Sequence, residues 1–284
     1  MNKQKDPISS LGTIRTFLRK GTCSETLCGV LDQAYGRPLP PEERASQGLA
    51  GGLMKGYQCG QLWGAALAAG ARAYQLFGPG PRAEAAAVAA AQHIVTAFRK
   101  RNKEINCLEL TGVDLSTAQN HPMRTFLKVF FQGKVVGCFT MSASTAHLAF
   151  REINATLADS RPVDAPAQGP VSCAAELARR MGASELHTVM AAGLAGGIGL
   201  SGGACGALGA ALWLIAMREG SPGGLQISQQ ASDAIDRFVE CADYEFECEK
   251  IVGKRFENAK EHAEYVCSGG CKRIIEDWGS GFAD

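Results

Sequence analysis

The chain has 284 residues, which is long enough for two domains of ordinary size that each bury a core. Its 29 basic and 28 acidic residues nearly cancel, and neither sign forms the long runs that mark a nucleic-acid partner. We therefore expect no nucleic-acid binding. Residues 1–7 are polar and lack the apolar stretch of a secretory signal, so we expect a cytoplasmic protein.

The composition includes eleven cysteines. Glutathione and thioredoxin keep cytoplasmic thiols reduced, so cysteines there favour metal binding, catalysis or redox sensing over a static disulfide scaffold. An odd number also excludes complete pairing within one chain. The cysteines are therefore the first place to look for chemistry.

Several segments have the periodicity or composition of helices. Apolar residues recur three and four positions apart over 11–35, which predicts an amphipathic helix with Cys23 within or beside it. The only segment where we expect a strand is Val129 to Val136. Four further segments predict helices with small residues that allow close packing: 61–76, 83–99, 207–217 and 228–251.

One uncharged run is long enough to span a bilayer, because no Asp, Glu, Lys or Arg occurs between Glu185 and Arg218. Gly and Ala dominate it, however, and Gly199 to Gly203 would interrupt a helix. We expect two buried helices separated by a loop and no membrane span. The G-x-G-x-x-G pattern at 197–202 follows no predicted strand, so it does not indicate a dinucleotide site.

The chain contains an internal duplication. Gly-Leu-Ala-Gly-Gly at Gly48 to Gly52 recurs at Gly193 to Gly197, and a Cys-Gly pair follows each copy, beginning at Cys59 and Cys205. In each half one further cysteine aligns upstream of the glycines, and two more align downstream of the Cys-Gly pair. The aligned sets are Cys23, Cys59, Cys107 and Cys138 in the first half and Cys173, Cys205, Cys248 and Cys271 in the second, with Cys267 as an alternative fourth member.

Three prolines among small and polar residues lie between the two copies and predict a linker. We expect a first domain at 1–158, a linker at 159–170 and a second domain at 171–284. The predicted fold class is all-α, with tandem duplicated helical domains that each place a glycine-rich loop before a cysteine-bearing helix.

Cys59 and Cys205 follow the glycines at predicted helix starts. Unpaired N–H groups and the macrodipole at a helix N-terminus favour negative charge, which lowers the pKa of a thiol there. Glycines also allow the backbone to approach the sulfur closely. Buried packing is the alternative role for a free cysteine, but recurrence in both halves with the same neighbours favours chemistry.

These residues resemble the redox-active family C_GCAxxG_C_C, whose domains are about as long as one half of this chain and carry four spaced cysteines. The first motif reads C-G-Q-L-W-G from Cys59, with Gln in place of Ala, and the second reads C-G-A-L-G-A from Cys205, with Ala in place of the last Gly. The resemblance covers nearly the whole chain and implies a helical protein with a cysteine-dependent redox role. The eight aligned cysteines are the candidate catalytic residues.

Three interpretations of these cysteines stay open. In the first, each set cycles between dithiol and disulfide, with Cys59 and Cys205 as attacking thiolates. In the second, each set binds an iron–sulfur cluster or zinc, although no C-x-x-C pair occurs. In the third, the protein is structural or sensory. An enzyme of this kind would be a thiol-dependent oxidoreductase acting on an unidentified redox partner or small molecule.

The remaining cysteines and the histidines carry weaker expectations. Cys28 and Cys241 have no counterpart in the other half and are expected to pack. Cys267 and Cys271 lie close enough in the sequence to form a local redox pair. We expect the five histidines to be solvated or core residues, because we find no recurrence at equivalent positions of the repeat.

Overall fold

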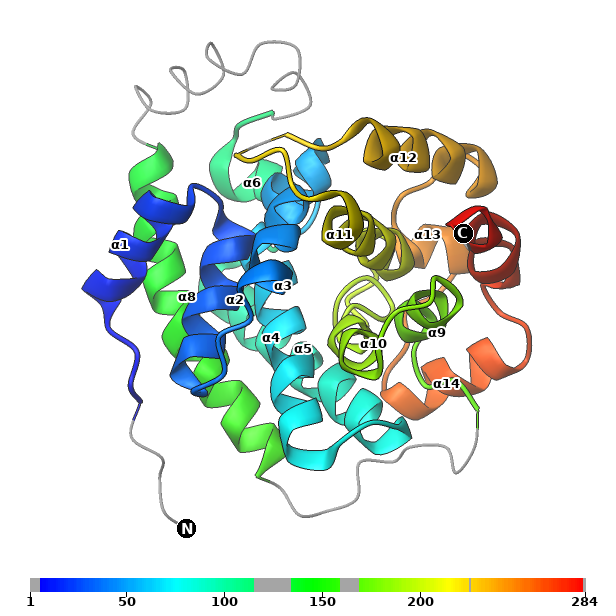
Figure 1. Ribbon diagram of the computed structural model, residues 1–284, viewed down its shortest axis with the longest axis horizontal. Helices are drawn as coiled ribbons and strands as arrows, with labels where there is room; N and C mark the ends of the chain where they lie inside the picture. The colour runs from blue at the N-terminus through cyan, green and yellow to red at the C-terminus, as the bar shows by residue number, and fades with distance from the viewer. Residues whose placement is uncertain (1–5, 115–133, 159–168, 225, 283–284) are drawn as a thin grey trace.

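The computed structural model describes residues 6–114, 134–158, 169–224 and 226–282. These residues form helices and helical turns (Figure 1), and they contain no β-strand, only two isolated β-bridges. The predicted all-α fold class is confirmed. None of the described helices is long and apolar enough to cross a membrane.

Each half contributes a similar series of helices. The first half has α1 (Ser10–Lys20), α2 (Cys23–Ala34), α3 (Pro40–Ala45), η1 (Ser46–Leu49), η2 (Gly52–Gly56), α4 (Gly60–Phe77), α5 (Pro81–Asn102), α6 (Cys107–Thr111) and α8 (Lys134–Leu157). The second half has α9 (Cys173–Arg180), α10 (Glu185–Ala192), α11 (Gly206–Glu219), α12 (Gln229–Cys241), α13 (Cys248–Val252), α14 (Ala259–Cys267), η3 (Arg273–Trp278) and η4 (Gly279–Phe282).

Two long predicted helices are each divided in the structure. The predicted helix over 11–35 breaks at Gly21, whose left-handed φ of 83° ends α1 before α2 begins. The predicted helix over 228–251 breaks at Asp243 and Tyr244, which have φ of 53° and 65°.

The expected strand at 129–136 is wrong for 134–136, which are the first residues of α8, and its remainder lies outside the described residues. The uncharged run from Glu185 to Arg218 forms α10 and α11 with a glycine loop between them, as predicted.

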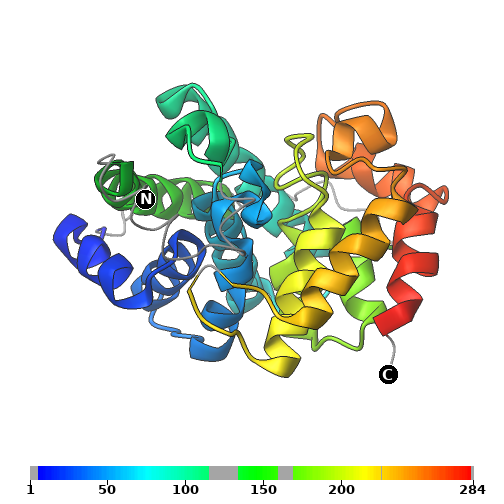
Figure 2. The ribbon, with the colours of Figure 1, turned by 90° about the horizontal axis from the view of Figure 1, so that it is seen from above.

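Helix α4 lies at the centre of the molecule because its small residues admit neighbours on two sides. A side chain at Gly64 would collide with the backbone oxygen of Ser24 on α2. A Cβ at Gly70 would lie 2.5 Å from the Cα of Met190 on α10, in the other half. The two halves therefore lie side by side across α4 (Figure 2).

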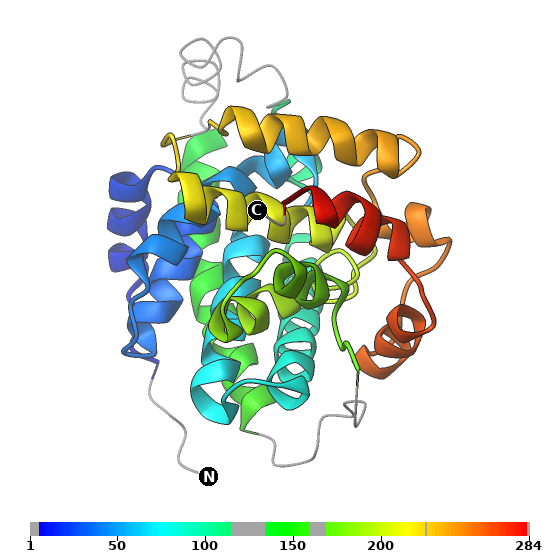
Figure 3. The ribbon, with the colours of Figure 1, turned by 45° about the vertical axis from the view of Figure 1, so that its right-hand side comes forward.

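The halves share one hydrophobic core, in which Trp63 and Trp213 are fully buried. The C-terminal turn η3 packs against α9 and α12 and completes the second half (Figure 3). Because this core crosses the repeat boundary, each half supports the other.

Candidate functional site: two cysteine clusters

Three cysteines of each half stand at the start of a helix. In the first half, Cys23 is the first residue of α2, Cys59 caps α4 and Cys107 is the first residue of α6. The same positions recur in the second half at Cys173, Cys205 and Cys248, which begin or cap α9, α11 and α13. The duplication in the sequence is therefore also a duplication of local structure.

A short antiparallel bridge joins the second and third cysteines of each half. The N–H of Cys59 donates to the carbonyl of Ile105 at 2.7 Å, and the N–H of Cys107 donates to the carbonyl of Tyr57 at 2.6 Å. The equivalent bonds in the second half run from Cys205 to Phe246 at 2.7 Å and from Cys248 to Gly203 at 2.6 Å. This pairing brings cysteines that are distant in the sequence to one place.

In each half, a glycine of the Gly-Leu-Ala-Gly-Gly motif donates a backbone hydrogen bond to the first cysteine. Gly51 has a left-handed φ of 62° and its backbone N–H donates to the sulfur of Cys23. Gly196 has a φ of 60° and donates to Cys173 in the same way. A residue with a side chain rarely adopts this conformation, which explains why glycine occupies both positions.

The glycine after the motif cysteine has a different role, which is to leave space. A Cβ at Gly60 would lie 2.5 Å from the Cys23 sulfur and 2.9 Å from the Cα of Ala50. A Cβ at Gly206 would collide with the backbone carbonyl of Leu194. The Cys-Gly pair therefore places the helix start against the glycine loop.

Cys23 is the thiolate of the first cluster. The hydrogen bond from the Cys59 thiol lowers the pKa of Cys23 to about 7, with further donation from the N–H groups of Gly51, Cys23 and Ser24, against the opposing effect of burial. The pKa of Cys59 is raised, because its thiol is the donor to Cys23 and its sulfur is buried. The prediction that Cys59 carries the lowered pKa is wrong, because helix capping is outweighed by the neighbouring sulfur.

Cys107 and Cys138, the other two aligned cysteines of the first half, lie near the charge of Cys23. Burial and then the charge of Cys23 raise the pKa of Cys107 and of Cys138 to about 12 in each case. Cys138 is half-buried on α8 and lines an open cleft of about 410 Å³ together with residues of α6. The four aligned cysteines of this half are thus electrostatically coupled to one another, with Cys138 at the outer edge.

The second half repeats this pattern with Cys173 as its thiolate. Burial opposes the charge on Cys173, but His262 and the N–H groups of Gly196 and Ala174 lower its pKa overall. Burial and then the charge of Cys173 raise the pKa of Cys205 to about 12. Cys205 was the predicted thiolate here, so this prediction is also wrong. Cys248 and Cys271 have raised pKa values through burial and the charges of Cys173 and Cys205.

His262 is positioned by the backbone. Its side chain is 1% exposed, and its Nδ1 lies 3.1 Å from the carbonyl of Val171, to which it donates. This bond leaves Nε2 for Cys173. Burial lowers the pKa of His262, but the charge and hydrogen bond of Cys173 raise it overall. Cys173 and His262 thus each favour the charged form of the other, and a cysteine beside a histidine is a common means of activating the thiol.

The sequence contains a signal for this histidine that we did not recognise. His262 is the fourteenth residue after Cys248, and His121 is the fourteenth residue after Cys107. The two histidines therefore recur at equivalent positions, contrary to our expectation. His121 lies outside the described residues.

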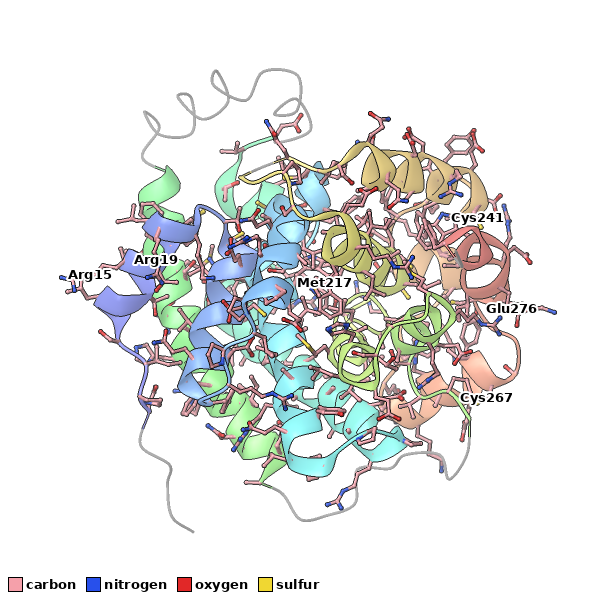
Figure 4. All side chains as sticks on the ribbon, viewed as in Figure 1. Arg15, Arg19, Met217, Cys241, Cys267 and Glu276 are labelled. Atoms are coloured by element: carbon pink, nitrogen blue, oxygen red, sulfur yellow. The ribbon has the colours of Figure 1, made fainter. Side chains whose placement is uncertain are left out.

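The cysteines outside the aligned sets contact other groups. Cys28 is buried and donates to Asp32 at 3.5 Å, and burial raises its pKa well above the usual range. Cys241 and Cys267 lie toward the edge of the second half (Figure 4), where their thiols donate to the carbonyls of Arg273 and Pro170. The charge of Cys173 raises the pKa of Cys271, so we assign Cys271 as the fourth member of the second cluster.

The described ranges contain no three His, Cys, Asp or Glu side chains arranged to hold a metal ion. All eleven cysteines are free thiols. What the two clusters do provide is a stabilised thiolate with further thiols next to it, and this combination suits nucleophilic attack followed by disulfide formation.

Comparison with known proteins gives one family. Its model, described as putative redox-active protein (C_GCAxxG_C_C), matches residues 22–151 and again residues 171–280, which together make up most of the chain. No curated protein and no solved structure matches the chain. The two matched segments each contain one of the cysteine clusters.

Proposed function

Since the chain belongs to the C_GCAxxG_C_C family of redox-active proteins, we propose that Cys23 and Cys59 form a dithiol–disulfide couple that exchanges with a small-molecule disulfide in the cytoplasm. The observation that carries this proposal is the placement of the Cys23 sulfur beside Gly60, the residue after Cys59, where the Cys59 thiol lowers the pKa of Cys23. A low-pKa thiolate in contact with a second thiol has both components that disulfide exchange requires.

The exchange proceeds in two displacements. The Cys23 thiolate attacks one sulfur of the small disulfide, so that a mixed disulfide forms and one small thiolate leaves. The Cys59 sulfur then attacks the Cys23 sulfur, so that the protein disulfide forms and the second small thiolate leaves. The protons of the two protein thiols end on the two released thiols, and two electrons pass from the protein to the small disulfide.

Local structure supports these roles. The N–H groups of Gly51 and Ser24 stabilise the attacking thiolate without a bulky side chain. Cys59 keeps its proton until Cys23 has reacted, which suits a resolving cysteine. Cys138 lines the cleft between α6 and α8, so the small disulfide meets this thiol where it enters.

We propose that the second cluster carries out the same chemistry from Cys173. His262 supplies the positive charge that favours the thiolate, and Cys205 or Cys271 is the resolving partner. The eight aligned cysteines would then form two redox centres in one rigid core. Cys28, Cys241 and Cys267 are outside this scheme.

A metal centre is the second candidate, because four sulfurs per half would suit an iron–sulfur cluster or a zinc ion. A single preparation of the protein distinguishes the metal centre from the dithiol–disulfide couple. Protein purified without oxygen is assayed for iron, zinc and sulfide, and its thiols are then counted before and after addition of glutathione disulfide. The redox couple predicts metal-free protein that loses thiols reversibly. Stoichiometric metal held by these cysteines would overturn it.

Single variants assign the thiols. Cys23→Ser should abolish formation of the first disulfide, and Cys59→Ser should leave a stable mixed disulfide on Cys23. Cys28→Ser is the control in the same helix, since Cys28 is buried and contacts Asp32 instead of Cys59. If Cys28→Ser reduced thiol loss as much as Cys23→Ser, the assignment of the couple would be wrong.

A further inference from the structure

Four buried side-chain oxygens near the first cysteine cluster have no hydrogen-bond partner within the described part of the chain. They are Thr22 Oγ1, Ser24 Oγ, Gln61 Oε1 and Ser142 Oγ, and each residue is at most 1% exposed. Buried polar groups are nearly always paired, so unpaired ones that gather in one place call for a ligand or water.

Each of these residues is tied to a cysteine of the cluster. Thr22 and Ser24 flank Cys23 in the sequence. Gln61 lies in the first turn of α4 after Cys59, and its Nε2 is 3.4 Å from the carbonyl of Cys138. Ser142 lies one helical turn beyond Cys138 on α8. The unpaired oxygens therefore come from the three elements that bear the thiols.

The second cluster lacks this polar set. Counting from the aligned cysteines, Ala174 replaces Ser24, Ala207 replaces Gln61 and Ile275 replaces Ser142. Ile275 packs against Cys173 in an apolar cluster. The unpaired oxygens are therefore particular to the first half and are not required by the repeated fold.

The N-cap residue gives a further contrast. Ser172 caps α9, since it accepts from the N–H of Ala175 and donates to the carbonyl of Ala192. Thr22 occupies the same place before α2 but makes no side-chain capping bond. Its hydroxyl is available to a bound molecule beside Cys23.

We propose that the first cysteine cluster binds and reduces a hydroperoxide, with Thr22, Ser24, Gln61 and Ser142 as its hydrogen-bonding groups. This inference rests on the proposed function, because it names an oxidant for the same Cys23–Cys59 couple. A hydroperoxide carries one O–H donor and two oxygen acceptors in a small volume, and hydroxyl and amide oxygens can pair with both kinds of group.

The space around the sulfur favours a small oxidant. Cys23 is half-buried, and its sulfur lies so close to Gly60 that a methyl group there would displace it. Cys59 is only 4% exposed. Cys138, whose pKa is raised by the charge of Cys23, lines an open cleft, and a molecule of two heavy atoms enters such a cleft more readily than a folded protein does.

The chemistry balances in two steps. The Cys23 thiolate takes the terminal OH of the hydroperoxide, the O–O bond breaks, and the leaving alkoxide is protonated to an alcohol by the proton that Cys23 had released. The Cys59 sulfur then attacks the sulfenic sulfur of Cys23, the S–S bond forms, and hydroxide leaves with the Cys59 proton as water. Two thiols and one hydroperoxide give one disulfide, one alcohol and one water. Two molecules of a small thiol then reduce the protein disulfide by the reverse of the proposed exchange, and one small disulfide is released.

The test compares two oxidants on the fully reduced chain without oxygen. The rate of Cys23 loss is measured with hydrogen peroxide and, separately, with glutathione disulfide. We expect hydrogen peroxide to react about 100-fold faster with Cys23 than with free cysteine at equal thiolate fraction, as expected for preorganised donors. In Cys59→Ser, dimedone should trap a sulfenic acid on Cys23.

The polar set is tested by introducing second-half residues. Gln61→Ala and Ser142→Ile should each lower the ratio of the peroxide rate to the disulfide rate by about tenfold, the effect of one lost hydrogen bond to a reacting group. Ser144→Ala is the matched control on α8, because its hydroxyl donates to Met141 in its own helix. It should leave both rates unchanged.

The outcomes separate the two proposals. If glutathione disulfide produces the Cys23–Cys59 disulfide but peroxide reacts no faster than with free cysteine, the inference fails and the proposed function stands. If neither oxidant links these cysteines, both fail. The peroxide rate of the unaltered chain decides the inference even if a variant does not fold.

Discussion

Gln58 of the first half donates from Nε2 to the backbone carbonyl of Gly197 in the second half at 2.9 Å. Its Oε1 accepts from the N–H of Ala204 at 2.8 Å, so this fully buried side chain is paired at both ends. Gln58 directly precedes Cys59, and Gly197 follows the glycine that donates to Cys173. One amide thus connects the backbones that support the two clusters.

Gln58→Ala should lower the free energy of unfolding by about 2–3 kcal/mol, because it leaves the buried N–H of Ala204 unpaired and removes one of the two donors to the carbonyl of Gly197, the other being Ser201. Gln92→Ala is a matched control, since Gln92 also makes a bond between the halves, to the carbonyl of Glu257, but in an exposed position. We expect a loss of about 0.5 kcal/mol or less there. Urea unfolding measures both, and equal losses would contradict the role of Gln58.

Alkylation should show a thiolate at Cys23 near neutral pH. The rate of iodoacetamide modification at Cys23 should reach half its maximum at about pH 7, because the thiol is deprotonated above its pKa. Cys107 and Cys138 should stay protonated and unreactive there, since each has a pKa of about 12. Peptide mass spectrometry across pH 5–9 reports each site, and a midpoint for Cys23 above pH 9 would refute the assignment.

His262→Gln should raise the pKa of Cys173, because the charge that favours its thiolate is lost while burial remains. At pH 7 the alkylation rate of Cys173 should fall about tenfold, because a smaller fraction of the thiol is ionised. The rate at Cys23 should not change. His93→Gln is the control, since His93 contacts Thr156 and neither cluster. An unchanged rate at Cys173 in His262→Gln would exclude the pair.

Gly60→Ala should displace Cys23 and lower stability by about 1–3 kcal/mol through overpacking. It should also reduce the rate of Cys23 alkylation. Gly137→Ala on α8 has no atom within 4 Å of the added Cβ, and it should raise stability by up to about 1 kcal/mol through helix propensity. Thermal unfolding checks both variants, and a neutral Gly60→Ala would show that the glycine loop is not tightly packed there.

Stability should decrease above about pH 9 in the reduced protein. Most buried thiols have folded pKa values above the ordinary 9.0, as Cys138 and Cys205 do, so they keep protons that the unfolded chain releases. The unfolded state then binds fewer protons, and the free energy of unfolding falls with pH. Cys23 acts in the opposite sense, with a contribution that is complete above pH 9 and lost as pH falls through about 7. Urea unfolding at pH 9 and pH 10 tests the decrease, and a flat profile would contradict it.

The duplication, the helical class and the positions of the cysteines could be predicted because glycines and cysteines recur at matching places in the sequence. The identity of the thiolates could not. Cys23 owes its low pKa first to the Cys59 thiol and Cys173 owes its low pKa first to His262. The N–H groups of Gly51 and Gly196 contribute further, and their directions depend on left-handed backbone that sequence spacing does not specify. Contacts between residues far apart in the chain outweighed the local helix-start argument.

His262 shows a different limit of prediction from the sequence. The equal spacing of His121 and His262 from the third cysteine of each half is visible in the sequence. Its meaning required the contact between His262 and Cys173, which joins α14 to α9 through packing of elements distant in the chain.

The most direct test of the Cys23–Cys59 couple is the disulfide map of the metal-free, fully reduced chain after one equivalent of oxidant. Peptide mass spectrometry should find Cys23 linked to Cys59 as the first disulfide of the first half. A first disulfide that excludes Cys23, or cysteines protected from oxidation by stoichiometric bound iron or zinc, would contradict the dithiol–disulfide couple.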